Sequence, residues 1–176
     1  MPDEMIVVRN LTKAFNGRTI LDGINVTVKK GEVLVIMGGS GCGKSTLLRQ
    51  IIGLSKPDAG EVWIRGQEVT RMDEKTFSEM RKKFGMLFQS GALFNSMTVG
   101  ENVSLPILEH TKLSEEDVNI MVKIKLELVG LTGFEHLMPS EISGGMKKRV
   151  GLARAIAMDP ELLFCDEPSA GLDPVM

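Results

Sequence analysis

The sequence predicts an α/β fold in which functional loops follow the ends of parallel strands, and two stretches carry this prediction. Residues 32–37 form a short apolar run that leads into a glycine-rich loop, and the apolar spacing of residues 47–52 then indicates a helix ending at Gly53. A second apolar run, residues 162–165, is followed by two carboxylates. Continuous apolar runs are typical of strands buried on both faces of a parallel sheet. We therefore expect these two strands to lie side by side.

The N-terminal part of the chain predicts antiparallel strands. Residues 5–15 form one strand, and Asn16-Gly17 is a strong hairpin signal. Two further strands, 19–21 and 24–28, flank Asp22-Gly23, and the second alternates apolar with polar residues as a half-exposed strand does. Residues 61–66 return as a strand after a cluster of breakers. This region is expected to form an antiparallel β-subdomain.

The middle and end of the chain alternate between helices and strands. We expect a helix over 73–83, a strand over 84–88, a helix from Ser114 to Gly130 and a helix from Ser143 to Met158. The segment from Ser90 to Pro139 has the character of helices and loops.

Composition indicates one ordinary domain. The chain has 176 residues, 43% hydrophobic and 25% charged, with a net charge of −2, which does not suggest a nucleic-acid partner. It contains no apolar run of the length that a membrane span needs, and from its first residues we expect no secretory leader. Its two cysteines lie in unrelated segments, so we expect a reducing compartment and no disulfide.

The glycine-rich loop matches the phosphate-binding pattern G-x-x-x-x-G-K-[ST] at every defined position. A strand, a glycine turn and a helix start direct several backbone N–H groups at one place, where they can bind phosphate. Lys44 can reach the β- and γ-phosphates, and the Ser45 hydroxyl suits Mg²⁺. The alternative is a chance match in an ordinary turn. The loop consists of Gly38, Gly39, Ser40, Gly41, Cys42, Gly43, Lys44, Ser45 and Thr46.

Asp166 and Glu167 follow the last apolar run and supply a second half to a phosphoryl-transfer site. Asp166 can hold the metal directly or through water, and Glu167 is then free to polarise an attacking water. Adjacent carboxylates also occur at ordinary helix starts. Their interpretation therefore depends on the phosphate-binding loop in the same chain.

Four further motifs resemble those of the ABC-type ATPases, the nucleotide-binding subunits of ATP-driven transporters. Gln89 matches the Q-loop glutamine, and Phe15 lies where that family has an aromatic residue that stacks on adenine. The signature LSGGQ is matched by Ile142-Ser143-Gly144-Gly145-Met146, and the D-loop by Ser169-Ala170-Gly171-Leu172-Asp173. The resemblance implies a P-loop, RecA-like core formed by residues 1–89 and 159–176, with a helical and signature subdomain at 90–158.

The same resemblance implies ATP and Mg²⁺ as cofactors and hydrolysis as the activity. The catalytic residues would be Lys44, Gln89 and Glu167, and the metal would be held by Ser45, Gln89 and Asp166. The signature residues Ser143, Gly144, Gly145 and Met146 would close on the ATP of a second subunit, which implies a homodimer, with Asp173 in the D-loop.

A narrower resemblance concerns what is transported. Residues 89–94, and Met146 followed by the basic cluster at 147–149, are similar to the Mce/Mla-type ATPases, which move phospholipid between bacterial membranes. This implies integral membrane permease subunits, Mce-domain and small regulatory partners, and a peripheral position on the cytoplasmic face of the inner membrane. The basic cluster is equally compatible with a solvated helix face. Another ABC importer or exporter, and a nucleotide-binding module without turnover, remain the alternatives.

The chain departs from the family pattern at its end. The family carries a switch histidine well after the acidic pair, whereas this chain ends nine residues after Glu167, and its two histidines, His110 and His136, precede that pair. We therefore expect an incomplete domain that lacks its C-terminal part and hydrolyses ATP near background on its own.

The segment after Gln89 is the expected contact with a transport partner. Its apolar residues alternate with polar neighbours, which suggests a small exposed apolar patch. The alternative is that they pack onto the chain's own helices. The residues are Leu93, Phe94, Met97 and Val99.

Overall fold

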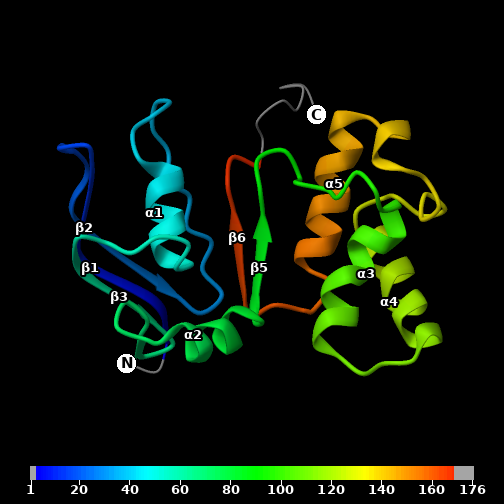
Figure 1. Cartoon of the computed structure of the whole chain (residues 1–176), viewed down its shortest axis with the longest axis horizontal. Helices are drawn as coiled ribbons and strands as arrows, with labels where there is room; N and C mark the ends of the chain where they lie inside the picture. The colour runs from blue at the N-terminus through cyan, green and yellow to red at the C-terminus, as the bar shows by residue number, and fades with distance from the viewer. Residues whose placement is uncertain (1–2, 169–176) are drawn as a thin grey trace. The chain divides into compact units, whose positions relative to one another are not determined.

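The computed structural model describes residues 3–168 and divides into two compact units, Met1–Arg81 and Lys82–Met176 (Figure 1). Each unit is described by itself. The first contains a four-stranded antiparallel sheet and two helices, and the second contains two parallel strands and a group of helices.

The sheet of the first unit has the strand order β2-β1-β3-β4. Its strands are β1 (Glu4–Phe15), β2 (Arg18–Lys29), β3 (Ala59–Ile64) and β4 (Gln67–Glu68). Asn16 and Gly17 join β1 to β2 with φ of 49° and 79°, the left-handed conformations that a two-residue hairpin turn requires. The predicted antiparallel subdomain is therefore confirmed, although β4 was not expected.

One prediction within this sheet is wrong. Asp22-Gly23 does not break the chain into two strands, because β2 runs through both residues. Gly23 has φ of 59°, and the pairing of β1 with β2 shifts register between Val8 and Leu11 and again before Lys13. The positive φ of Gly23 therefore accompanies bulges in one continuous strand, and the chain does not turn there.

Two short helices complete the first unit: α1 (Lys44–Ile51) and α2 (Glu74–Arg81). α1 buries Leu47 and Ile51. Gly53 follows it with φ of 73°, and a Cβ atom there would lie 1.8 Å from the Phe77 ring of α2. The absence of a side chain at Gly53 therefore lets α2 pack directly on the end of α1.

The expected strand at residues 32–37 is not found. None of the strand ladders within residues 3–168 includes this segment, and Val33 and Met37 are 86% and 87% exposed. The expected neighbour, β6 (Leu162–Cys165), pairs instead with β5 (Phe84–Leu87). An apolar run becomes a buried strand only where a neighbouring strand accepts its backbone hydrogen bonds, and the described residues supply none here.

In the second unit, β5 and β6 are parallel and in register from Phe84↔Leu162 to Leu87↔Cys165. The Phe84 and Phe164 rings meet edge to face at 5.5 Å. A Cβ atom on Gly85 would lie 2.3 Å from the Ala155 carbonyl oxygen, so the glycine allows the end of a helix to approach the strand backbone. This pair of strands brings their two carboxyl ends together.

The helices of the second unit are α3 (Val99–His110), α4 (Glu115–Leu128) and α5 (Gly144–Ala155), with a 3₁₀ turn η1 (Pro139–Glu141). They enclose a core whose central side chains are almost fully buried: Val103, Ile107, Leu126, Leu131 and Val150. Thr98 and Glu101 form a capping box that starts α3. The boundary predicted between a core (1–89, 159–176) and a helical part (90–158) stays a prediction.

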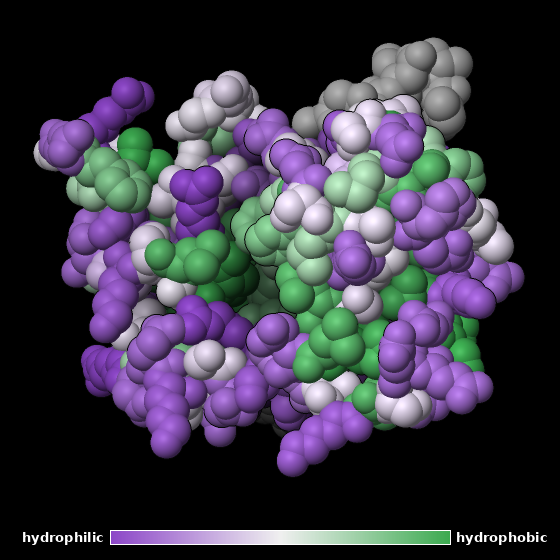
Figure 2. Space-filling model, turned by 45° about the vertical axis from the view of Figure 1, so that its right-hand side comes forward, coloured by the Kyte–Doolittle hydropathy of each residue, from purple (hydrophilic) through white to green (hydrophobic). Residues whose placement is uncertain are grey.

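The outer surface of these helices mixes charged and apolar side chains (Figure 2). Leu108, Ile120, Ile124 and Leu128 are between 49% and 67% exposed. No helix within residues 3–168 combines the length and the apolar character of a membrane span.

Candidate functional site

The predicted phosphate-binding loop is a tight curl in front of α1. Gly41 and Gly43 have φ of 75° and 99°, a region that L side chains rarely adopt. A Cβ atom on Gly38 would lie 2.6 Å from the Cys42 sulfur. The loop therefore depends on glycine for both its conformation and its compactness.

Lys44 lies across this loop. Its Nζ donates to the carbonyl oxygens of Gly38 at 2.9 Å and Gly39 at 3.0 Å. The first backbone N–H groups of an α-helix have no acceptor within the helix, and α1 begins directly after this loop. Backbone N–H donors and a lysine are the groups that bind a phosphate oxyanion, and the glycines of the loop add no side chains. The loop therefore fits the phosphates of a nucleotide.

The loop packs against the β1–β2 hairpin. A Cβ atom on Gly43 would lie 3.1 Å from the side chains of Ile20 and Leu21 on β2. Phe15, at the end of β1, pairs across the hairpin with Arg18 and is 49% exposed. The predicted base-stacking aromatic therefore lies on the hairpin that touches the phosphate-binding loop.

A second cluster lies at the carboxyl ends of β5 and β6. The Gln89 amide donates to the Glu167 carboxylate at 2.7 Å, and the backbone N–H of Asp166 donates to the Leu87 carbonyl at 2.9 Å. Glu167 has φ of 48°, an uncommon conformation for a residue with a long side chain. The parallel pairing thus brings Gln89 close to Asp166 and Glu167, which follow it by more than seventy positions in the sequence.

The predicted signature residues begin α5. Ser143 is the N-cap, and its hydroxyl accepts the Met146 N–H at 3.2 Å. Gly144 is exposed, and a Cβ atom there would meet nothing within 4 Å. Met146 is half-buried against the helical core. This helix start is consequently open to an anion from outside the chain.

The predicted site residues therefore fall into two groups. Phe15 and the loop 38–46 belong to the first unit, and Gln89, Asp166 and Glu167 belong to the second together with the signature residues at 143–146. Asp173 of the D-loop lies outside the described residues. Both cysteines are free and exposed, and partial burial raises the pKa of the Cys165 thiol, which precedes Asp166.

The sequence analysis missed two residues that hold the segment after Gln89. Asn102 is fully buried, accepts the Phe94 N–H at 2.8 Å and donates to the Phe94 carbonyl at 3.1 Å. Arg154 donates to the Gly91 carbonyl at 2.7 Å, and burial lowers the pKa of its guanidinium. The sequence carries no signal that distinguishes these two residues from other polar helix residues.

The predicted apolar patch in this segment is smaller than expected. Val99 is fully buried in the helical core, and Leu93 packs against the same core. Phe94 is 51% exposed, with the Arg154 guanidinium 5.9 Å from its ring centre. Val99 was misassigned because it belongs to the first turn of α3, whose capped start fixes which face is inward.

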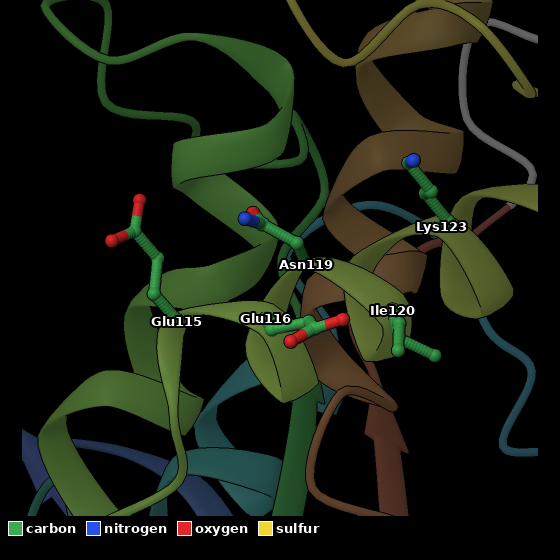
Figure 3. A pocket seen from close by; sticks show the side chains of 5 residues that line it. All are labelled: Glu115, Glu116, Asn119, Ile120 and Lys123. Atoms are coloured by element: carbon green, nitrogen blue, oxygen red, sulfur yellow. The ribbon is translucent and has the colours of Figure 1, made fainter.

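A surface hollow also lies along α4 (Figure 3). All of its labelled side chains come from this one helix, and they point outward without converging on a common point. We assign no function to it. Its lining residues are Glu115, Glu116, Asn119, Ile120 and Lys123.

Comparison with known families decides the assignment, because the family model described as ABC transporter matches residues 21–170. The chain belongs to this family. The match includes the phosphate-binding loop, Gln89, the signature helix and the acidic pair. Phe15 precedes the matched range.

Curated relatives cover nearly the whole chain. The intermembrane phospholipid transport system ATP-binding protein MlaF of Haemophilus influenzae is 50% identical over 99% of this chain, which spans 66% of that protein. A probable ribonucleotide transport ATP-binding protein, mkl of Mycobacterium leprae, is 47% identical over 97% of the chain, which spans 49% of that protein. The chain thus spans about half to two thirds of the length of these relatives.

Solved structures support the same fold. The ATP-binding cassette MJ0796, described as a dimer bound to ADP and Pi, has a TM-score of 0.89 and 34% identity, covering 97% of this chain and 77% of its own. The cbiO1 protein of Clostridium perfringens, described as part of the ABC transporter complex cbiONQ, has a TM-score of 0.86 and 34% identity, covering 98% and 68%. The chain therefore has the α/β fold of a P-loop ABC ATPase cassette.

Proposed function

We propose that this chain is the ATP-binding subunit of an ABC transporter that hydrolyses ATP as a homodimer to move phospholipid between or across bacterial membranes. The observation that carries the proposal is the hydrogen bond between Gln89 and Glu167 at the ends of two parallel strands. A carboxylate fixed by an amide at this place is suited to orienting water rather than to a structural ion pair. Family membership and the phosphate-binding loop support it.

Each predicted residue has a role in this proposal. The loop amides of residues 38–46 and Lys44 bind the ATP phosphates, and Phe15 stacks on the base. Ser45, Gln89 and Asp166 hold Mg²⁺, which neutralises charge on the phosphates when bound. Glu167 positions and deprotonates the attacking water.

The homodimer is proposed from the signature helix. Ser143, Gly144 and Gly145 form a second anion-binding helix start in a chain that already has a phosphate-binding loop. Two copies related by a two-fold axis would place each helix start on the partner's ATP. The dimeric MJ0796 structures support this arrangement.

Phospholipid as the substrate is proposed from the similarity to MlaF. Permease, Mce-domain and small regulatory partners are part of the same proposal, as is a peripheral position on the cytoplasmic face of the inner membrane. The similarity to mkl favours a second candidate, an ABC ATPase serving another transport system. A further alternative is a subunit that binds ATP without hydrolysing it, and hydrolysis assays distinguish this alternative from the proposed function.

Replacement of Lys44 by alanine tests nucleotide binding. We expect ATP affinity to fall by about tenfold to a hundredfold, because charge-assisted hydrogen bonds of this kind contribute roughly 1.5–3 kcal/mol. Calorimetry with MgATP measures the effect, and Lys30→Ala, at an exposed lysine of the same unit, is the control. Equal affinity of Lys44→Ala and the parent would refute the assignment of the loop.

Replacement of Phe94 by aspartate tests the proposed partner contact. ATP binding should be unchanged, because Phe94 is half exposed and is not one of the residues to which a role in nucleotide binding is assigned. Stimulation of ATPase activity by the permease in proteoliposomes should be lost, since a charge replaces the exposed apolar ring. Leu128→Asp, at a more exposed apolar residue of α4, is the control. Unchanged stimulation would show that the permease contacts another surface.

A further inference from the structure

Asp58 lies in the connection between α1 and β3 and contacts the end of β1 at three points. Its carboxylate accepts the Ala14 N–H at 2.7 Å and the Lys13 ammonium at 2.8 Å. Its own N–H donates to the Thr12 carbonyl at 2.9 Å. Three consecutive residues before Phe15 are thereby fixed to the chain that leaves the helix of the phosphate-binding loop.

Lys13 carries this restraint to the aromatic ring. Its Nζ also donates to the Lys56 carbonyl at 2.9 Å and lies 5.4 Å from the centre of the Phe15 ring. The Lys13 side chain is only 15% exposed, so the ammonium has a defined place. A cation over one ring face attracts the ring and leaves the opposite face for stacking.

The ionisation of Asp58 suits this arrangement. Its hydrogen bond to Lys13, followed by that to the Ala14 amide, holds the pKa of its carboxyl below the ordinary value. The carboxylate is therefore charged at neutral pH, and both hydrogen bonds are of the stronger, charge-assisted kind.

We propose that Asp58 is a positioning residue for base recognition: through Lys13 and the Ala14 amide it fixes Phe15 as a platform next to the phosphate-binding loop. The inference rests on the proposed nucleotide function. The platform and the loop are linked because Ile20 and Leu21, on the strand paired with β1, touch Gly43. Asp58 thus contributes to binding of the base, while the phosphates are bound by the loop itself.

A purely structural carboxylate provides the matched control. Asp73 accepts two hydrogen bonds from Thr76 at the start of α2, and these likewise lower the pKa of its carboxyl. Asp73→Ala therefore removes a comparable set of contacts in the same unit without touching Phe15.

The experiment compares MgATP with magnesium tripolyphosphate, which has the phosphates but no base, by calorimetry on the full chain. Asp58→Ala should weaken ATP binding by about fivefold to tenfold, within the range of base–aromatic stacking, and leave tripolyphosphate binding within about twofold of the parent. Asp73→Ala should leave the ratio of the two affinities unchanged. Added to Phe15→Ala, Asp58→Ala should cause no further loss, because both act on the same platform.

The outcomes separate this inference from the proposed function. A parent protein that binds neither ligand overturns both. If the parent binds both ligands and Asp58→Ala weakens both equally, or weakens neither, only the inference is overturned. The inference is also overturned if the losses of affinity caused by Asp58→Ala and Phe15→Ala are additive. If Asp58→Ala does not fold, Lys13→Met replaces it as the test, because methionine keeps the aliphatic stem but removes the ammonium. Lys13→Met should show the same selective loss of ATP affinity. Equal losses of affinity for the two ligands would overturn the inference.

Discussion

In a form of the protein extended to the length of its relatives, Glu167→Gln is expected to lower steady-state ATP hydrolysis by about 10²–10⁴-fold while leaving ATP affinity near that of the parent. The glutamine side chain has nearly the same shape and can keep a hydrogen bond to Gln89, which lies 2.7 Å from the carboxylate. It cannot accept a proton from water. The loss should therefore appear in the chemical step and not in the fold.

A second expected consequence is the accumulation of an ATP-bound dimer. When hydrolysis is blocked, the two ATP molecules that join the proposed subunits are not consumed, so the dimer persists. Size-exclusion chromatography with and without MgATP measures this, beside a phosphate-release assay.

Glu161→Gln is the matched control. Glu161 directly precedes β6, at the opposite end of this strand from Glu167, and pairs with Lys83 at 3.6 Å. Its replacement should leave turnover within about twofold of the parent, as expected for an exposed ion pair. If both variants hydrolyse ATP at the parent rate, Glu167 is not the residue that activates water.

The local backbone conformations are what the sequence predicted correctly. The curl before α1 requires glycine at positions 41 and 43 because of their positive φ, and Ser143 caps α5 through a hydrogen bond three residues away. The information for such features is contained within a few residues. The hairpin at Asn16-Gly17 was predictable for the same reason.

Features that depend on distant partners were missed or wrong. The apolar run at 32–37 has a strand composition, but its conformation depends on a neighbouring strand, and the described residues provide none. The hydrogen bonds that Arg154 donates to Asn102 and to the Gly91 carbonyl join segments more than fifty residues apart. A single sequence contains no signal for such a pairing, because each residue alone is an ordinary helix residue.

Gly151 illustrates a close contact that only the structure reveals. A Cβ atom at this position of α5 would lie 2.8 Å from the Gly91 Cα and 3.0 Å from the Gly91 carbonyl oxygen. The same carbonyl accepts the Arg154 hydrogen bond. Backbone atoms cannot rotate away as a side chain can, so any side chain at 151 must displace the segment that begins at Gln89.

Gly151→Val should therefore lower the free energy of unfolding by about 3 kcal/mol or more, the upper range for overpacking. Gly144→Val is the control, because it adds the same side chain to the same helix where a Cβ atom meets nothing within 4 Å. Chemical denaturation of both variants measures the difference. Equal stability of the two would mean that Gly91 and α5 do not pack as closely as described.

The hydrolysis rate of Gly151→Val should also fall, and for a reason separate from stability. Gly91 is two residues from Gln89, whose amide holds Glu167, so displacement of this segment moves the group that fixes the proposed base. Positioning errors near 1 Å can cost on the order of a hundredfold in rate. Measured under conditions where the variant is still folded, unchanged turnover would show that Gln89 is held by β5 alone and that contact with α5 is not required.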